Sequence, residues 1–299
     1  MSRATLPTGI ELEYETFGSD NDPTLLLVMG LSAQLIHWDT GFCELLAAEG
    51  YRVVRYDNRD AGLSTHLDGQ VAEPLAVMAA ITSGAPVPEV AYRLTDMAAD
   101  AIGLLDHLAV DQAHIVGASM GGMIVQTMAI EHPERVASMV SVMSMPGDPS
   151  VGQPTPEAMA VLLRTPPADR DAYIAGSADA AVFASKRYVD VERIRQFAAA
   201  AFDRAFYPEG SARQLAGIWA SGDRSEQLRD LRVPTLVIHG RDDTLITLSG
   251  AERTAELIPG ADLLVLADMG HDLPEQLWPK LVSAIATHIT TSADVGASV

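Results

Sequence analysis

The sequence has little of what disulfides, cysteine-based metal sites and nucleic-acid interfaces require. Its 299 residues include a single cysteine, Cys43, which excludes an internal disulfide and a structural zinc site built on thiolates. Only 20 residues are basic against 40 acidic ones, for a net charge of −20, and just two of the basic ones are lysines. So acidic a chain repels phosphate backbones and anionic membranes. We therefore expect neither nucleic acid nor a membrane as a partner.

Long apolar runs are also missing. The most apolar stretch, residues 24–31, is far shorter than the roughly 20 residues that a membrane-spanning helix needs. The first ten residues contain no apolar core of signal-peptide length, so a cytoplasmic location is expected. The hydrophobic fraction of 48% is too high for a disordered chain and allows a large core. The oligomeric state is left open.

Apolar runs alternate with segments of helical spacing along most of the chain. Strands are expected at residues 10–17, 24–29, 51–56, 114–116 and 136–143, followed by two buried strands at 234–239 and 263–267. Helices are expected between them, for example at 42–49, 94–108 and 274–288. Strands that alternate with helices in this way predict an α/β fold around a mostly parallel sheet.

The alternation stops between residues 146 and 228. This segment opens with P-G-D-P-S-V-G-Q-P-T-P, and its recognisable elements are helices at 191–204 and 211–220. We therefore expect residues 1–145 and 229–299 to form a catalytic core and residues 146–228 to form a helical insertion over one end of the sheet. The long connection at 67–88 is expected to add a helix on the same rim.

A serine occupies the turn between a predicted strand and a predicted helix. The stretch A-H-I-V-G-A-S-M-G-G-M places Ser119 in a G-x-S-x-G pattern. Gly117 and Gly121 keep side chains out of this crowded elbow, where a nucleophile has strained backbone angles. The turn also directs the Met120 N–H, at a helix N-terminus, toward an oxyanion that forms at Ser119. Ser119 is the predicted nucleophile.

A nucleophilic serine needs a base, and the base needs a carboxylate to orient it. His271, in the glycine-containing loop A-D-M-G-H-D after the last strand, is the predicted base. Asp243, in H-G-R-D-D after the preceding strand, is the favoured acid, with its neighbour Asp242 and the more distant Asp148 as alternatives. The order Ser119, Asp243, His271 is the order that hydrolases of this architecture use.

The second oxyanion donor is expected from the loop that follows residues 24–29. Gly30 lets the backbone approach the substrate, which leaves the N–H of Leu31 free to point into the site. An apolar pocket is expected from the insertion, with Trp38, Met145 and Trp219 as candidate lining residues. No phosphate loop, dinucleotide fingerprint or H-E-x-x-H motif is found, so no cofactor and no metal are expected.

With these motifs in order, the chain from about residue 10 to 288 resembles the α/β-hydrolase superfamily of serine esterases. The resemblance implies an α/β-hydrolase fold whose insertion, after the sixth core strand, is a helical cap that forms the substrate pocket. Most relatives carry D-x-R-G-x-G-x-S where this chain has D-N-R-D-A-G-L-S, with Asp60 in place of glycine. This variant, together with L-L-L-V-M-G before the oxyanion loop, resembles the aclacinomycin methylesterase group, which cleaves a methyl ester from a polyketide.

The function predicted from these features is hydrolysis of the carboxylic ester of a small-molecule substrate through an acyl-enzyme. The net charge of −20 favours a neutral ester, because an acidic protein repels free carboxylates, and the apolar pocket expected from the insertion favours an apolar one. Lactone hydrolysis, carbon–carbon bond hydrolysis and perhydrolysis use the same triad and remain alternatives. A ligand receptor on a hydrolase scaffold is the alternative from another class, although a binding protein has no physical need for a complete triad.

Overall fold

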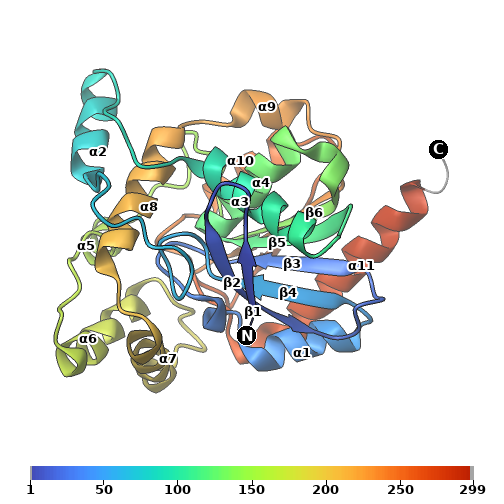
Figure 1. Cartoon of the computed structure of the whole chain (residues 1–299), viewed down its shortest axis with the longest axis horizontal. Coiled ribbons are helices and arrows are strands. Elements are labelled where there is room, and N and C mark those ends of the chain that lie inside the picture. The colour runs from blue at the N-terminus through green and yellow to red at the C-terminus, as the bar shows by residue number, and fades with distance from the viewer. Residues whose placement is uncertain (1, 297–299) are drawn as a thin grey trace.

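An eight-stranded sheet forms the centre of the protein (Figure 1). The structure is a computed structural model that describes residues 2–296. The strand order is β1-β2-β4-β3-β5-β6-β7-β8. β2 is antiparallel to both of its neighbours, β1 and β4, and all the other neighbouring strands are parallel. The strands are β1 (Ser2–Thr5), β2 (Glu11–Phe17), β3 (Thr24–Val28), β4 (Arg52–Tyr56), β5 (Ala113–Ala118), β6 (Val136–Val142), β7 (Thr235–Gly240) and β8 (Asp262–Leu266).

Helices cover both faces of the sheet and bury two apolar cores. On one face lie α3 (Leu94–His107), α4 (Met120–Glu131) and α10 (Ser249–Leu257), and on the other lie α1 (Thr40–Ala48) and α11 (Trp278–Gly296) (Figure 1). All five residues of β3 are buried, as expected for a strand that is covered on both faces. The predicted α/β-hydrolase architecture, a mostly parallel sheet between helical layers, is confirmed.

The chain between β6 and β7 folds into helices. They are α5 (Pro156–Leu162), α6 (Arg170–Ser177), the 3-10 turn η3 (Ala178–Val182), α7 (Val191–Arg204), α8 (Pro208–Ser221) and α9 (Ser225–Arg229). Helices α5 to α8 gather beside the sheet in Figure 1, together with α2 (Pro74–Ser83), the helix expected in the long connection after β4. We call residues 146–228 the cap segment.

Two details of the strands differ from the sequence-based expectation. The antiparallel β1 lies ahead of the first predicted strand and pairs Ser2–Thr5 with residues 11–14 of β2. β8 is not buried as expected, because it is the edge strand of the sheet, with Leu263 and Val265 38% and 39% exposed. An apolar run is therefore not sufficient to place a strand in the middle of a sheet.

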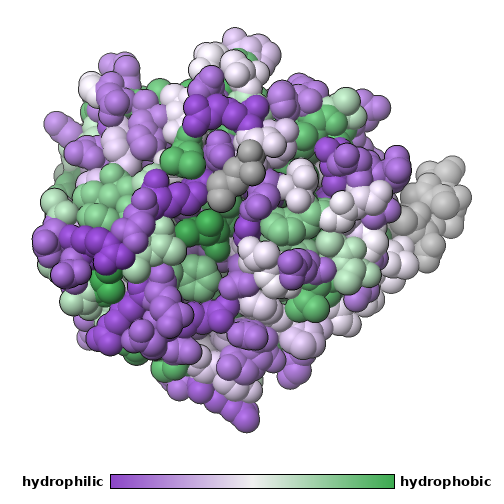
Figure 2. Space-filling view, turned by 60° about the horizontal axis from the view of Figure 1, so that its bottom comes forward, coloured by the Kyte–Doolittle hydropathy of each residue, from purple (hydrophilic) through white to green (hydrophobic). Residues whose placement is uncertain are grey.

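Short 3-10 turns complete the connections: η1 (Leu35–His37), η2 (Pro133–Arg135) and η4 (Glu275–Leu277). The helix expected from residue 274 begins instead at Trp278, after η4. Among residues 2–296, no helix combines the length and the apolar character needed to cross a bilayer. On the face shown in Figure 2, hydrophobic patches lie between hydrophilic ones.

Candidate active site

Ser119 lies at the tight turn between β5 and α4. Its backbone angles, φ 57° and ψ −121°, belong to a region that side chains rarely adopt. The two glycines of the motif make this turn possible. A Cβ on Gly117 would stand 2.1 Å from the carbonyl oxygen of Gly121, and one on Gly121 would stand 2.0 Å from that of Val28. The turn therefore holds the hydroxyl at the carboxyl edge of the sheet.

His271 and Asp243 reach this serine from the loops after β8 and β7. The Nε2 atom of His271 lies 2.9 Å from Ser119 Oγ, and its Nδ1 atom lies 2.7 Å from Asp243 Oδ2. The other carboxylate oxygen of Asp243 accepts hydrogen bonds from the N–H groups of Leu245 and Ile246, at 2.8 and 2.9 Å. These two bonds fix the carboxylate, and the carboxylate fixes the imidazole with Nε2 facing the hydroxyl.

The two alternative carboxylates point elsewhere. Asp242 faces the cap segment, where its Oδ2 accepts from the Lys186 N–H at 3.1 Å and its Oδ1 lies 3.5 Å from the Lys186 ammonium. Asp148 accepts from the N–H and the hydroxyl of Ser150, and these bonds lower the pKa of its carboxyl. Of the three candidates, Asp243 is the one that contacts His271.

A second imidazole lies behind the same carboxylate. His239 is completely buried at the end of β7, and its Nε2 atom lies 2.8 Å from the carbonyl oxygen of Ile246 and 3.5 Å from Asp243 Oδ2. Burial lowers the pKa of His239 despite the neighbouring carboxylate. A neutral His239 that donates to Ile246 thus supports the loop on which Asp243 is placed.

Two backbone N–H groups are placed beside the serine. The N–H of Met120 is the first of α4 and has no acceptor within its own helix. Gly30 packs so closely on Ser119 that a Cβ there would lie 3.0 Å from the serine Cβ. Within the described part of the chain, the N–H of Leu31, next to Gly30, has no hydrogen-bond acceptor. Both groups line the same space as Ser119 Oγ.

The triad opens into a large cavity between the sheet edge and the cap segment. Its volume is about 1830 Å³, above the roughly 300–1,000 Å³ of common ligand pockets. Met145 and Trp219 line it, as do Phe183, Phe197 and Phe202 from the cap segment. Most of the lining is apolar, which suits a large apolar ligand.

Trp38 does not take the place expected for it. It is 1% exposed and packs against Phe42 with the ring centroids 5.9 Å apart, within the core beneath α1. Among the described residues, those lining the cavity include Phe42 but not Trp38. The Trp38 side chain points into the core, where it packs against the apolar face of α1.

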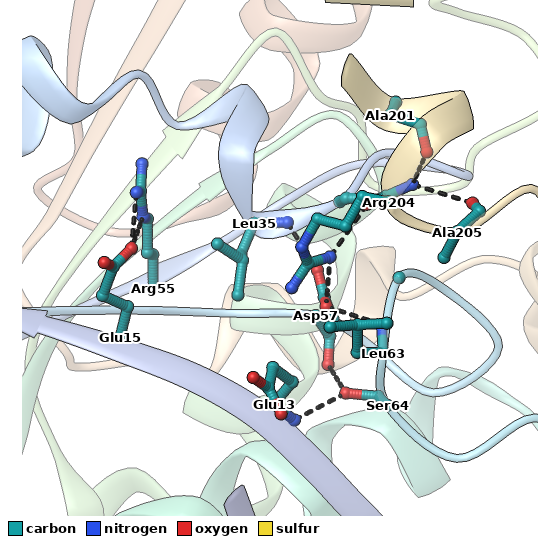
Figure 3. A network of polar contacts seen from close by, with 12 residues as sticks. Glu13, Glu15, Leu35, Arg55, Asp57, Leu63, Ser64, Ala201, Arg204 and Ala205 are labelled. Carbon is teal, nitrogen blue, oxygen red and sulfur yellow. Dashed lines mark hydrogen bonds and ion pairs between the residues drawn. The ribbon is translucent and has the colours of Figure 1, made fainter. Parts of the chain in front are cut away.

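The D-N-R-D motif after β4 connects loops of the site, and Figure 3 shows the contacts of its first residue, Asp57. Asp57 is fully buried, and its Oδ1 accepts from the Leu35 N–H at 2.6 Å while its Oδ2 lies 2.7 Å from Arg204 Nη1 in α7. Asn58 donates to the carbonyl oxygen of Met29 at 2.9 Å. Both ends of the loop that carries Leu31 are therefore fixed by two consecutive residues of the motif.

Asp60 holds a second cap helix. It has a positive φ of 63°, in the left-handed region that favours glycine. Its carboxylate accepts from Arg213 of α8, with Nε–Oδ2 at 2.8 Å and Nη2–Oδ1 at 3.1 Å, and from the Tyr92 hydroxyl at 2.8 Å. A carboxylate in a conformation that favours glycine is thus paired with a buried arginine.

These residues extend the site beyond what the sequence motifs indicate. Asp60 gave one usable signal, since a carboxylate in a glycine position needs a cationic partner. Nothing in the pattern pointed to Arg204 or Arg213, because they lie on helices of the cap segment that reach the motif only after folding. Among residues 2–296, no group of three or more histidine, cysteine or acidic side chains is placed to hold a metal ion.

The sheet, the elbow and the serine–histidine–aspartate geometry define the class of this protein. The sequence profile of the alpha/beta hydrolase fold family matches residues 23–276, and the chain belongs to that family.

Two enzymes and one solved structure are similar to this chain. The chain is 27% identical to rhodomycin D methylesterase from Streptomyces sp. (strain C5), over 93% of this chain and 95% of that enzyme. It is 28% identical to 3-oxoadipate enol-lactonase 2 from Acinetobacter baylyi, over 86% and 85%. The meta-cleavage product hydrolase of Pseudomonas fluorescens shares the fold, with a TM-score of 0.76 at 22% identity over 98% of both chains.

Proposed function

We propose that this protein is a serine carboxylesterase that hydrolyses a neutral, largely apolar ester through an acyl-enzyme. The observation that carries the proposal is the continuous chain of contacts from Asp243 through His271 to Ser119, at 2.7 and 2.9 Å. Such a chain converts a weakly nucleophilic hydroxyl into a nucleophile. The similarity to a methylesterase and to an enol-lactonase supports hydrolysis of a carbon–oxygen bond at a carbonyl.

In the first half-reaction, Ser119 Oγ attacks the ester carbonyl while His271 Nε2 accepts the hydroxyl proton. The carbonyl oxygen becomes an oxyanion that accepts hydrogen bonds from the N–H groups of Leu31 and Met120. His271 then donates its proton to the departing alcohol, and the acyl group stays on Ser119. Asp243 remains ionised and stabilises the imidazolium.

In the second half-reaction, water takes the place of the alcohol. His271 removes a proton from this water, which attacks the acyl carbonyl and forms a second oxyanion in the same site. Collapse of this intermediate breaks the bond to Ser119, and the hydroxyl regains the proton from His271. The free acid leaves toward solvent, and its departure is favoured by the net charge of −20.

The substrate is expected to be large. We propose that the cap segment, residues 146–228, acts as a cap domain on a core formed by residues 1–145 and 229–299, and that the cavity between them receives the ester. The sulfur atoms and rings of Met145, Trp219 and Phe202 suit a planar, multi-ring acid or alcohol. The resemblance to methylesterases favours a methyl ester on such a ring system.

An acyl-enzyme burst tests the proposal. A short-chain p-nitrophenyl ester should release one equivalent of nitrophenol before the steady state, and mass spectrometry should place the acyl group on Ser119. A methyl ester of a polycyclic aromatic acid should be turned over with a lower KM than methyl acetate. The Ser119→Ala variant should show neither burst nor turnover. An active enzyme that keeps full turnover after this substitution would refute the esterase mechanism, as would a wild-type enzyme without a burst.

A further inference from the structure

We propose that Gln214, a residue of the cap segment, is a positioning residue for the oxyanion hole. It holds the turn of residues 30–33 in the shape that presents the Leu31 N–H to the reacting carbonyl. This inference rests on the proposed function, because it assigns Gln214 a part in stabilising the oxyanion of that reaction.

The turn that carries Leu31 is strained. The Gly30 carbonyl accepts from the Ala33 N–H at 3.3 Å, so Leu31 and Ser32 are its two central residues. Ser32 has a φ of 58°, in the left-handed region that favours glycine. A residue other than glycine stays there only when its surroundings hold it. Some neighbouring group must therefore stabilise this shape.

Gln214 is that group. Its Oε1 accepts from the Ser32 N–H at 2.7 Å, and its Nε2 donates to the carbonyl oxygen of Arg59 at 2.8 Å. The side chain is completely buried, so water does not compete for either bond. Arg59 is itself fixed by two bonds to Asp100, at 2.5 and 2.7 Å. The amide therefore has one orientation, with its oxygen toward Ser32.

A second cap helix holds the far side of the same loop. Gln34 donates from Nε2 to the carbonyl oxygens of Ala201 and Ala205, at 2.7 and 2.9 Å, and its Oε1 accepts from Arg204 at 2.8 Å. Figure 3 shows Arg204 between these two carbonyls and Asp57. Because α7 and α8 both form hydrogen bonds with this loop, the oxyanion hole has its observed shape when the two cap helices are packed against the core. Gln214 is the contact that lies next to Leu31 itself.

The test uses a readout specific to the oxyanion. A thionoester places sulfur, a weak hydrogen-bond acceptor, where an ester places oxygen, so loss of an oxyanion donor slows the ester much more than the thionoester. We would measure kcat and KM for an ester and its thionoester analogue in the wild type and in Gln214→Met, which keeps the length of the side chain and removes its polar atoms. A purely structural defect lowers kcat for the ester and for the thionoester by the same factor.

The expected result is a fall of about tenfold to a hundredfold in ester kcat, part of the 10²–10³ that a lost oxyanion donor costs, with KM within about twofold. The thionoester should change by less than about threefold. Ser32→Gly, added to Gln214→Met, should restore several-fold of the ester rate, because glycine adopts positive φ without strain. Gln214→Asn, too short to reach both partners, carries the same expectation as Gln214→Met if the latter does not fold.

Ser221→Ala is the matched control. Ser221 lies on the same helix α8 and also accepts from a backbone N–H of the core, that of Leu94 at 2.9 Å, away from the elbow. The Ser221→Ala variant should keep the wild-type ratio of kcat for the ester to kcat for the thionoester. Equal losses for both substrates in the Gln214 variants, or no loss, would overturn the inference while the wild type remains an esterase. A wild type without Ser119-dependent turnover would refute the proposed function instead.

Discussion

The buried pair of Asp60 and Arg213 gives a quantitative prediction about how the cap is attached. The two side chains are 0% and 3% exposed and share two hydrogen bonds. Arg213→Leu leaves the carboxylate buried without its cation, and Asp60→Gly leaves the guanidinium buried without its anion. Removing one partner of such a pair typically costs about 3–5 kcal/mol of folding free energy.

The double variant should be much less damaging than the sum of the two. With both charges gone, the Tyr92 hydroxyl and the Leu67 N–H lose their acceptor Asp60. The Leu67 N–H is only partly buried and can bind water, whereas the Tyr92 hydroxyl is buried, and one unsatisfied buried donor costs about 1–3 kcal/mol. Glycine at position 60 also relieves the positive φ of 63°, worth up to about 1 kcal/mol. We therefore expect Asp60→Gly with Arg213→Leu to lose about 1–3 kcal/mol, against about 6–10 for the separate losses added together.

Urea unfolding followed by far-ultraviolet circular dichroism measures all four proteins of this cycle. The slope of free energy against urea should stay the same in the four, so that midpoints can be compared directly. A coupling of about 3 kcal/mol or more is the expected outcome. If the two losses add to within about 0.5 kcal/mol, the pair does not act as a unit and our account of Asp60 is wrong.

Two further predictions concern the triad and the acid limit of stability. Asp243→Asn should lower kcat by about 10⁴-fold with little change in KM, because the carboxylate no longer holds the imidazole of His271 in the required tautomer. The kcat of Asp242→Asn should stay within about threefold of the wild-type value. Equal losses of kcat in the two variants would show that Asp243 is not the acid of the triad. Burial, with the charge of His288, lowers the pKa of His114 from 6.5 to about 4. The unfolded chain binds that proton first, so about 2 kcal/mol of stability should be lost as the pH falls from 6.5 to 4. His114→Gln should flatten that slope in urea titrations, and an unchanged slope would exclude His114 as its source.

The fold could be predicted from the sequence because its signals are local. The unbroken apolar run of β3, the glycines at residues 117 and 121 and the loop ends that follow parallel strands all depend on near neighbours. The error at β8 had a non-local cause, since its burial is decided by whether another strand lies outside it. β1 escaped notice because four mostly exposed residues carry no periodicity.

The residues of the candidate site likewise include some that local sequence signals predict and some that depend on contacts between distant parts of the chain. Ser119, His271 and Asp243 follow strand ends, so the topology of the sheet brings them together once the strands are assigned. Trp38 was misplaced because an aromatic residue near a loop packs equally well on a core or in a pocket. Gln214 could not be predicted, since its role arises from a hydrogen bond to Ser32, 182 positions away in the chain.

The positive-φ residues set a limit on how far this enzyme can be made heat-resistant. Of the non-glycine residues described, five have positive φ, and four of them, Ser32, Asp60, Ser119 and Met143, line the cavity. Each holds backbone strain, on the order of 1 kcal/mol, that a glycine would not have. Glycine at Ser119 would remove the proposed nucleophile, and glycine at Asp60 would leave Arg213 buried without its anion, so at these two positions the strain cannot be released without losing turnover or a buried ion pair. Substitutions meant to raise the thermal stability of the enzyme should instead be made on the solvent-facing sides of the helices that cover the sheet.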